Sequence, residues 1–407
     1  MDVRTPMSRL PEFMRFDRGN RARSPVFLVT NSSNPFDPLN TAHQKRFNDG
    51  LTDILFGLDG FQPRSPVLIK VHIGESNSNT RMLPVYTENM IKYLQQNNID
   101  NIFFGDTTVT YSSSRGYREN GPKAQPYLAM AEKHGWTKYA PFVVLDRPET
   151  GPMHGFDFYE EEIILSQDAS GRFKRFSLSG GFARSDSVIH HAHLTLHGLA
   201  HVALCVKGLT MGLSGRTGKH TMHQHYYPSI DEEECSRCLL CVETYPEEAL
   251  TEDENSVPIR RPDRCIGCGE CMAVCPNNAI TMEGQEITDW AKGEDSLPYR
   301  MVNYLIGMTV NRWEHIVHVA HLYNITLLCD CVNQEQTSIC NDIGFLVGRN
   351  PFAVDRADRQ ILEQRLAEQG GKSIAAFHPG DTGYKIFEYA QTTYGVITEP
   401  EIEVIKV

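Results

Sequence analysis

The chain of 407 residues, with 40% hydrophobic and 22% charged residues, has the composition of an ordinary globular protein and the length of roughly two or three domains. Its formal charge of −12 argues against a protein that binds nucleic acid. The N-terminus lacks the apolar core of a secretory signal, and no run of about 18 uncharged apolar residues predicts a membrane span, so we expect a cytoplasmic protein.

The first half of the chain alternates between short apolar runs and segments with helical spacing. The runs end in turn or polar residues, as buried strands do, and they occupy residues 24–30, 64–74, 101–107 and 140–146. Between them, residues 84–99 and 124–136 repeat their apolar positions as a helix does. This order predicts an α/β fold with a mostly parallel sheet and helices on both faces.

Polar residues accompany the ends of two of these runs. His72 and Glu75 lie at the carboxyl end of the run at 64–74, and Asp106 and Thr107 close the run at 101–107. In parallel α/β sheets, functional groups gather beyond the carboxyl ends of the strands. We therefore expect these side chains to line a cleft at that edge.

The composition changes to Cys, Glu, Pro and Asn over residues 231–285, and the alternation then resumes. Two strands and two helices are expected at residues 325–331, 343–348, 351–368 and 384–394. Because insertions are tolerated at surface loops, we predict one α/β domain in two parts, 1–230 and 286–407. An α+β ferredoxin-like domain at 231–285 would interrupt it.

The inserted segment holds two cysteine motifs with the spacing of bacterial two-cluster ferredoxins, C-x2-C-x2-C-x3-C-P. The second motif, CIGCGECMAVCP, is intact and supplies Cys265, Cys268, Cys271 and Cys275. The first, CSRCLLCVETYP, supplies Cys235, Cys238 and Cys241 but has Tyr245 at the fourth position. Zinc sites take four ligands in two pairs, which these triplets do not offer. We therefore predict two [4Fe-4S] clusters held by thiolates in a reducing cytoplasm.

In such ferredoxins the fourth cysteine of each motif ligates the other cluster. Cys275 is then expected to complete the cluster of the first motif, whereas the cluster of the second motif lacks its local fourth thiolate because residue 245 is tyrosine. Three explanations stay open: one iron is lost, another cysteine reaches in from Cys329, Cys331 or Cys340, or the fourth iron is open. An open iron would act as a Lewis acid toward water, substrate or an added ligand.

Several segments outside these motifs resemble the iron–sulfur family called domain of unknown function 362. They are KVHIGE at 70–75, NT at 79–80, GDTT at 105–108, SR at 114–115, HLTLH at 193–197, KGLTMG at 207–212, LLCDC at 327–331 and DIGFLVGRNPFAVD at 342–355. The resemblance runs from about residue 65 to the end and implies the fold and the clusters rather than a reaction. Family members typically have two complete motifs and a lysine in the histidine segment, where this chain has Tyr245 and Thr195.

Eight of the sixteen histidines lie between residues 190 and 225. His193, His197 and His201 are four apart and would share one face of a helix. Such a face suits a metal or proton-relay site, and it equally suits hydrogen-bonded histidines beside an apolar core. His72 and His193 lie on the family-like motifs, and a cleft histidine near an open iron would serve as a general acid or base.

The segment MGLSGRTGKH imitates a phosphate loop but lacks its first glycine and the Ser or Thr after the lysine. Arg216 and Lys219 could still hold a carboxylate or phosphate, or belong to a solvated turn. Lys70 and Lys207 follow or lie within apolar runs, so each is either paired in the core or a cleft residue.

Three functions fit these residues. An iron–sulfur oxidoreductase would pass electrons from a donor such as ferredoxin, flavodoxin or a reductase, through the complete cluster, to the incomplete one, where a small molecule is reduced. Its candidate catalytic residues are Lys70, His72, His193 and Lys207. The alternatives are a ferredoxin-like electron-transfer protein and non-redox Lewis-acid chemistry. An electron carrier needs neither the large domain nor a missing cysteine, so these features favour the enzyme. The acidic runs at 231–234 and 247–255 would help a basic electron donor to dock.

Overall fold

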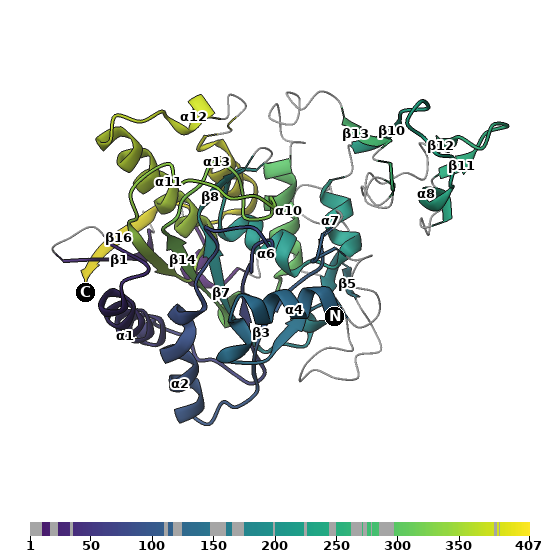
Figure 1. Cartoon of the computed structure of the whole chain (residues 1–407). Coiled ribbons are helices and arrows are strands. Elements are labelled where there is room, and N and C mark those ends of the chain that lie inside the picture. The colour runs from purple at the N-terminus through teal and green to yellow at the C-terminus, as the bar shows by residue number, and fades with distance from the viewer. Residues whose placement is uncertain are drawn as a thin grey trace.

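The centre of the molecule is an eight-stranded sheet (Figure 1). This computed structural model describes residues 10–16, 23–32, 36–109, 113–116, 124–146, 160–164, 175–197, 200–223, 226–243, 250–261, 271, 275–277, 279–284, 297–377, 381 and 383–407. Adjacent strands run parallel except beside β15, which is antiparallel to both neighbours. Across the sheet the strands are β16 (Pro400–Lys406), β1 (Ser24–Thr30), β15 (Gly344–Gly348), β14 (Ile316–Leu322), β7 (Ser187–His193), β2 (Val67–Lys70), β3 (Ile102–Asp106) and β4 (Phe142–Val144). The predicted mostly parallel α/β sheet is confirmed.

Helices cover both faces of this sheet because successive strand residues point to opposite sides. Val67 and Ile69 of β2 pack with α1, α2 and α4, whereas Leu68 packs with α6, α10 and α13 on the other face. The helices are α1 (Thr41–Gly57), α2 (Glu88–Gln96), α4 (Gln125–Lys133), α5 (Gly180–Ala183), α6 (Cys205–Leu213), α7 (Arg216–Met222), α8 (Leu240–Glu243), α10 (Leu297–Met308), α11 (Pro351–Glu368), α12 (Ile374–Phe377) and α13 (Lys385–Tyr394). Single 3₁₀ turns lie at Glu12–Met14, Pro84–Thr87, Trp136–Lys138 and Trp313–His315. Within the described ranges, no helix is long and apolar enough to cross a membrane.

The two longest helices begin at asparagine caps. The side chain of Asn40 accepts hydrogen bonds from the amides of Ala42 and His43, and Asn350 does the same for Phe352 and Ala353. These bonds satisfy amides that a first helical turn leaves without partners. Pro351 then follows at the first position of α11, where its missing N–H costs nothing.

Short antiparallel pairs complete the described structure. They are β5 (Glu160–Ile164) with β6 (Arg175–Ser179), β8 (Thr195–His197) with β9 (His201–Ala203), β10 (Tyr226–Ile230) with β13 (Ile280–Gly284), and β11 (Leu250–Glu252) with β12 (Pro258–Arg260). The elements α8, β11, β12 and β13 belong to the cysteine-rich segment, and together with β10, which directly precedes it, they project from the α/β body (Figure 1). The predicted domain boundaries remain a prediction.

Two expectations about local structure are wrong. His193, His197 and His201 do not share a helix face but lie on β7, β8 and β9, since the β-branched Val188 and Ile189 begin a central strand. Residues 325–331 form a loop, not a strand: Ile325 is buried, but Leu327 is 39% exposed. The run lies in the loop that joins β14 to β15, and these two strands pair with each other.

Candidate functional site

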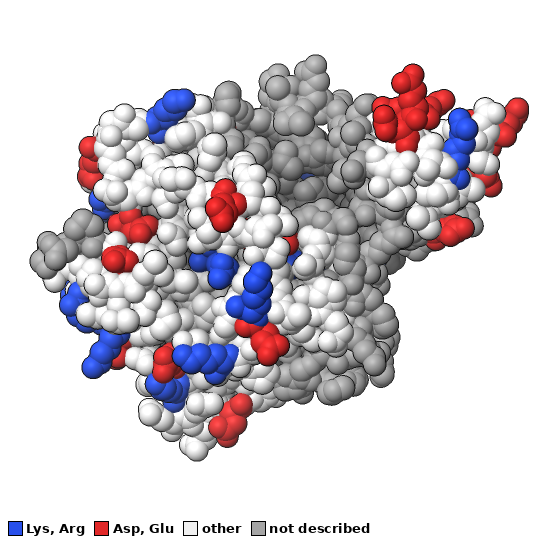
Figure 2. Space-filling view, viewed as in Figure 1, with Lys and Arg blue, Asp and Glu red and all other residues white. Residues whose placement is uncertain are grey.

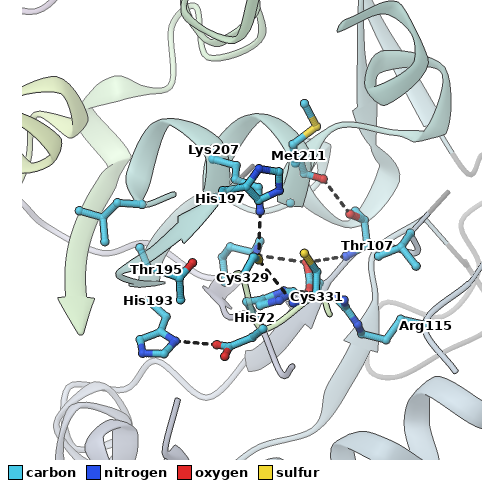
Figure 3. Close-up of a pocket in the computed structure, with 18 of the residues that line it drawn as sticks. His72, Thr107, Arg115, His193, Thr195, His197, Lys207, Met211, Cys329 and Cys331 are labelled. Carbon is cyan, nitrogen blue, oxygen red and sulfur yellow. Dashed lines mark hydrogen bonds and ion pairs between the residues drawn. The ribbon is translucent and has the colours of Figure 1, made fainter. Parts of the chain in front are cut away.

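A cavity of about 290 Å³ lies where the carboxyl ends of β2, β3 and β7 meet helix α6 and the 323–340 loop (Figure 3). All four residues that the sequence singled out as catalytic line it: Lys70, His72, His193 and Lys207. Of the four polar residues expected to line a cleft at the strand ends, His72, Asp106 and Thr107 do so, whereas Glu75 is buried outside the lining. The cavity wall contains four cationic side chains and two carboxylates. The cations are Lys70, Arg115, Lys207 and Lys219, and the carboxylates are Asp106 and Asp330. The fixed charge of the wall therefore favours an anionic ligand.

Asp106 is the buried acid of this wall. Its Oδ1 lies 3.1 Å from Nζ of Lys70, and its Oδ2 accepts a hydrogen bond of 2.9 Å from the hydroxyl of Tyr127. Burial on its own raises the pKa of Asp106, but the charges of Lys70 and His72 outweigh it and leave the pKa below its ordinary value. Burial lowers the pKa of Lys70, against the attraction of Asp106. The pair is thus a buried ion pair at the base of the cavity.

Arg115 orients His72. Its Nε donates to Oε1 of Glu75 at 2.8 Å, and its Nη1 lies 3.1 Å from Nδ1 of His72. The same Nδ1 lies 3.4 Å from Oδ2 of Asp106, so this nitrogen meets both an acid and a base of the wall. The other ring nitrogen, Nε2, is buried and has no hydrogen-bond partner in the described part of the chain. Arg115 and Asp106 therefore fix His72 on the cavity wall through Nδ1.

Lys219 comes from the glycine-rich segment that imitates a phosphate loop. It lies on α7, is 6% exposed, and donates to Oγ1 of Thr107 at 2.7 Å and to the carbonyl of Ser214 at 3.3 Å. Arg216, the other cation of that segment, is not part of the lining. The structure thus brings Lys219 into the site and leaves Arg216 outside it.

Two cysteines from the 323–340 loop face Lys207. Nζ of Lys207 lies 3.3 Å from Sγ of Cys329, and the amide of Cys331 donates to the same sulfur at 3.4 Å. A hydrogen bond from the Cys331 thiol, together with the Lys207 ammonium, holds the pKa of Cys329 well below its ordinary value although burial opposes this. Cys329 is therefore the more acidic thiol of the pair.

His193 is fixed by the same loop. Its Nδ1 lies 2.5 Å from Oδ2 of Asp330, and its Nε2 lies 2.7 Å from the carbonyl of Tyr323. Burial alone would lower the pKa of His193, but the charge of Asp330 raises it. Hydroxyls of Ser78 and Thr80 also donate to Asp330, at 3.3 and 3.2 Å. His193 thus anchors the loop that carries the two cysteines.

The cysteines of the first ferredoxin motif lie close to Cys275 of the second. Burial raises the pKa of Cys241 to about 11, and the negative charges of Cys238, Cys275 and Cys235 act in the same direction. The loop between them winds through left-handed conformations at Arg237 and Leu239, with φ of 56° at each. The amide of Ala279 donates to Sγ of Cys275 at 3.3 Å, as amides do to cluster sulfur. This donor set fits a [4Fe-4S] cluster.

Part of the second motif cannot be placed. Cys265, Cys268 and Tyr245 lie outside the described residues. Cys271 is described and buried beside Cys241, Leu250 and Ile280. The ligands of the second cluster and the role of position 245 therefore stay predictions.

The family model for the "domain of unknown function (DUF362)" matches residues 67–358. The chain belongs to the DUF362 family. The match includes β2, β3, β7, α6 and the loop with Cys329, so the whole cavity of this DUF362 protein lies within the family region.

Shorter stretches of this DUF362 protein resemble ferredoxins. It is 43% identical over 61 residues to the pyruvate synthase subunit PorD of Methanocaldococcus jannaschii, which covers 15% of this chain and 71% of that one. It is 30% identical over 141 residues to formate hydrogenlyase subunit 6 of Escherichia coli, and the match covers 33% of this chain and 73% of that protein. A ferredoxin of Rickettsia felis is 37% identical over 65 residues, and the match covers 16% of this chain and 59% of the ferredoxin. Part of the chain is therefore ferredoxin-like.

Some residues in the cavity wall or directly behind it are not marked as functional by the sequence. Arg115 was noted only as part of a motif, and Asp330 was not singled out. Tyr127 lies in a helix whose pattern gave no sign of a role, yet it binds Asp106. No local signal could have found these contacts, because each joins segments far apart in the chain.

Helix α6 packs closely against Lys70 and His190 because it carries glycine at the two positions that face these side chains. A Cβ on Gly212 would lie 2.2 Å from Cε of Lys70, and one on Gly208 would lie 2.5 Å from Nε2 of His190. We expect Gly212→Ala to lower the free energy of unfolding by about 1–3 kcal/mol through overpacking. Gly57→Ala is the matched control, since nothing lies within 4 Å of a Cβ there. Urea unfolding under anaerobic conditions measures both, and equal midpoints would contradict the close approach.

Proposed function

We propose that the protein is an iron–sulfur oxidoreductase that reduces a small anionic molecule held in the cavity. Electrons would enter from a low-potential donor at the complete cluster of Cys235, Cys238, Cys241 and Cys275, and continue to the second cluster. The ferredoxin-like part supports iron–sulfur electron transfer. The observation that carries the further step is the cavity itself: a pure electron carrier has no use for a cavity of about 290 Å³ lined by four cationic side chains.

The residues of this chain would have distinct roles toward such a ligand. Lys70, Lys207 and Lys219 supply ammonium groups that bind a carboxylate or phosphate. His72, on the cavity wall, is the side chain from which a proton could pass to the reduced product. His193 and Asp330 hold the loop in place. The clusters, when bound, supply single electrons at low potential.

A basic electron donor would find a complementary surface. Acidic side chains gather on the projecting part that carries β10 to β12 (Figure 2). Asp231, Glu232, Glu233 and Glu234 are exposed and directly precede Cys235, and Cys238 is exposed as well. Such a surface speeds the association of an oppositely charged partner and is weakened by salt.

Anaerobic reconstitution tests the proposed function. We expect about eight irons per chain and an electron paramagnetic resonance signal that changes when small carboxylates or phosphates bind. Lys219→Met should weaken that response about tenfold or more, and the surface change Lys92→Met should leave it intact. About seven irons with an inert three-iron signal would overturn the proposal.

Tyr245→Cys provides a second arm of the same experiment. A cysteine at this position would give the second cluster its fourth thiolate, so the ligand-induced change in the signal and any turnover should disappear while electron uptake persists. An unchanged ligand response in this variant would show that the second cluster has no open iron.

A second function, ferredoxin-like electron transfer, is favoured by the relatives named ferredoxin and by the exposed acidic surface. It predicts reversible electron uptake, no response to any cavity ligand, and no effect of Lys219→Met.

A further inference from the structure

Three potential metal ligands converge on the cavity apart from the ferredoxin motifs. They are His197 of β8 and the two cysteines of the 323–340 loop, Cys329 and Cys331. One donor atom from each lies within 4.8 Å of the others. A tetrahedral zinc site separates such atoms by roughly 3.5–3.8 Å, so the side chains need to close by about an ångström at most.

The charges around this group suit a divalent cation with two thiolates. A bare 2+ ion would be repelled by the ammonium and guanidinium groups of the cavity wall. Two thiolates cancel that charge, so the ion and its sulfurs form a neutral unit. Lys207, 3.3 Å from Sγ of Cys329, then supplies the N–H···S contact that commonly supports a metal-bound sulfur.

The group also leaves room for a fourth ligand. His197, Cys329 and Cys331 all belong to the cavity lining, and Figure 3 shows the two cysteines between Lys207 and His197 on one side and His72 on the other. Two sulfurs and one imidazole with an open position is the arrangement of catalytic rather than structural zinc. An oxygen or sulfur of a molecule in the cavity could occupy that position.

His197 is the weakest of the three donors. The amide of Ala200 donates to its Nδ1 at 3.1 Å. A metal would either replace that amide at Nδ1 or bind Nε2 after the ring proton has moved to Nδ1. Each route gives up one hydrogen bond, so His197 is expected to contribute less to affinity than either cysteine.

The other convergent group among the described residues is less suitable. It consists of His190, Cys205 and His318, all buried. Its two imidazoles already meet at 3.2 Å between their Nδ1 atoms, and neither Cys205 nor His318 lines the cavity. That group has no open position for a substrate.

We propose that His197, Cys329 and Cys331 bind a thiophilic divalent cation of the zinc class, with an open coordination position facing the cavity. The ion would hold and polarise the same anion that Lys70 and Lys219 attract. The site does not depend on the clusters, so its failure would leave the proposed redox function standing, and the reverse also holds.

Zinc itself is the probe. The full chain, with its clusters reconstituted anaerobically, is dialysed against zinc, and metals are counted by mass spectrometry alongside iron. We expect about one zinc per chain, with X-ray absorption at the zinc edge showing sulfur at about 2.3 Å and nitrogen at about 2.0–2.1 Å. Loss of an outer-shell partner alone costs about 10–100-fold in affinity, so Cys329→Ser and Cys331→Ser should each weaken zinc binding at least about tenfold.

Cys340→Ser is the matched control, because that buried cysteine belongs to the apolar cluster beside α11. His197→Ala serves where a cysteine variant does not fold. Zinc retained by all variants would overturn the proposal. So would a Cys331→Ser variant that loses iron instead of zinc, which would mark Cys331 as a cluster ligand. A Cys329–Cys331 disulfide that persists in the anaerobic protein with zinc present would overturn it too.

Discussion

Asp106→Asn is expected to lower the free energy of unfolding by about 3–5 kcal/mol, because it leaves a buried ammonium without its counter-charge. Asp106 is 3% exposed and Lys70 is 2% exposed, with Nζ and Oδ1 3.1 Å apart. Arg115 lies 3.9 Å from Asp106, and its charge, like that of Lys207, disfavours the charged form of Lys70. In the variant the amide oxygen of Asn and the carbonyl of Val71, at 2.8 Å, can still accept hydrogen bonds from Lys70, but no negative charge balances the ammonium.

A double-mutant cycle measures the pair directly. Lys70→Met should be destabilising alone, but combining it with Asp106→Asn should cost less than the sum of the two, with a coupling of about 0.5–3 kcal/mol. Asp146→Asn is the matched control: Asp146 is 1% exposed and accepts two hydrogen bonds from Thr108. Urea unfolding of the four proteins of the cycle and of the Asp146→Asn control measures these free energies. If Asp106→Asn lowered the free energy of unfolding no more than Asp146→Asn does, the charge of the ion pair would not contribute to stability beyond an ordinary buried hydrogen-bonded carboxylate.

Asp355 is expected to make the protein less stable as pH rises from about 4 to about 7. This carboxyl on α11 caps α6 from another part of the chain, accepting hydrogen bonds from the amides of Cys205 at 2.8 Å and Val206 at 2.9 Å. Burial raises the pKa of Asp355 to about 7, although the two amides oppose the shift. Burial and the neighbouring charge of Asp355 also raise the pKa of Asp358.

The sign follows from proton binding. Between about pH 4 and 7 the folded protein holds a proton on Asp355 that the unfolded chain has released, so raising the pH favours unfolding. A shift from the model-peptide value of 3.8 to about 7 corresponds to a total on the order of 4 kcal/mol. About 2–3 kcal/mol of this falls between pH 5 and 7.5.

Asp355→Asn isolates this contribution. The variant keeps a carbonyl that can accept from α6 but has no proton to exchange, so its stability curve should be flatter than that of the wild type by about 2–3 kcal/mol over this range. The exposed change Asp53→Asn serves as the control, because it should leave the wild-type slope in place. Parallel curves for wild type and Asp355→Asn would contradict a buried, protonated carboxyl.

Local patterns predicted much of the scaffold. The helix expected at 351–368 is α11, because Asn350 and Pro351 mark its start in the sequence itself. The cleft expected beyond the strand ends exists, and Asp106 and Thr107 lie in it, because strand polarity in a parallel sheet brings those ends to one edge. Such features depend on neighbours in the chain.

The remaining features depend on contacts between distant segments. The first turn of α6 has no capping side chain of its own, and its cap is Asp355, 150 residues away. The pairing of Lys207 with Cys329 likewise joins a helix to a loop 122 residues on. The apolar run at 325–331 has the composition of a strand, but it forms the loop between β14 and β15, which pair with each other. A hydrophobic pattern describes only residues that are close together in the chain, so it cannot predict contacts between distant segments.

The parallel pairing of β1 with β16 has a consequence for how the molecule is made. Ser24 through Thr30 align with Pro400 through Lys406 in unbroken register. The strand β1 can therefore form these hydrogen bonds only after β16 has been synthesised. During synthesis at about 5–20 residues per second, one side of β1 stays unsatisfied until nearly all of the intervening chain has left the ribosome. The cysteine-rich segment emerges well before that moment. Metal loading there can therefore precede closure of the α/β body, and slow loading would prolong the exposure of an aggregation-prone edge.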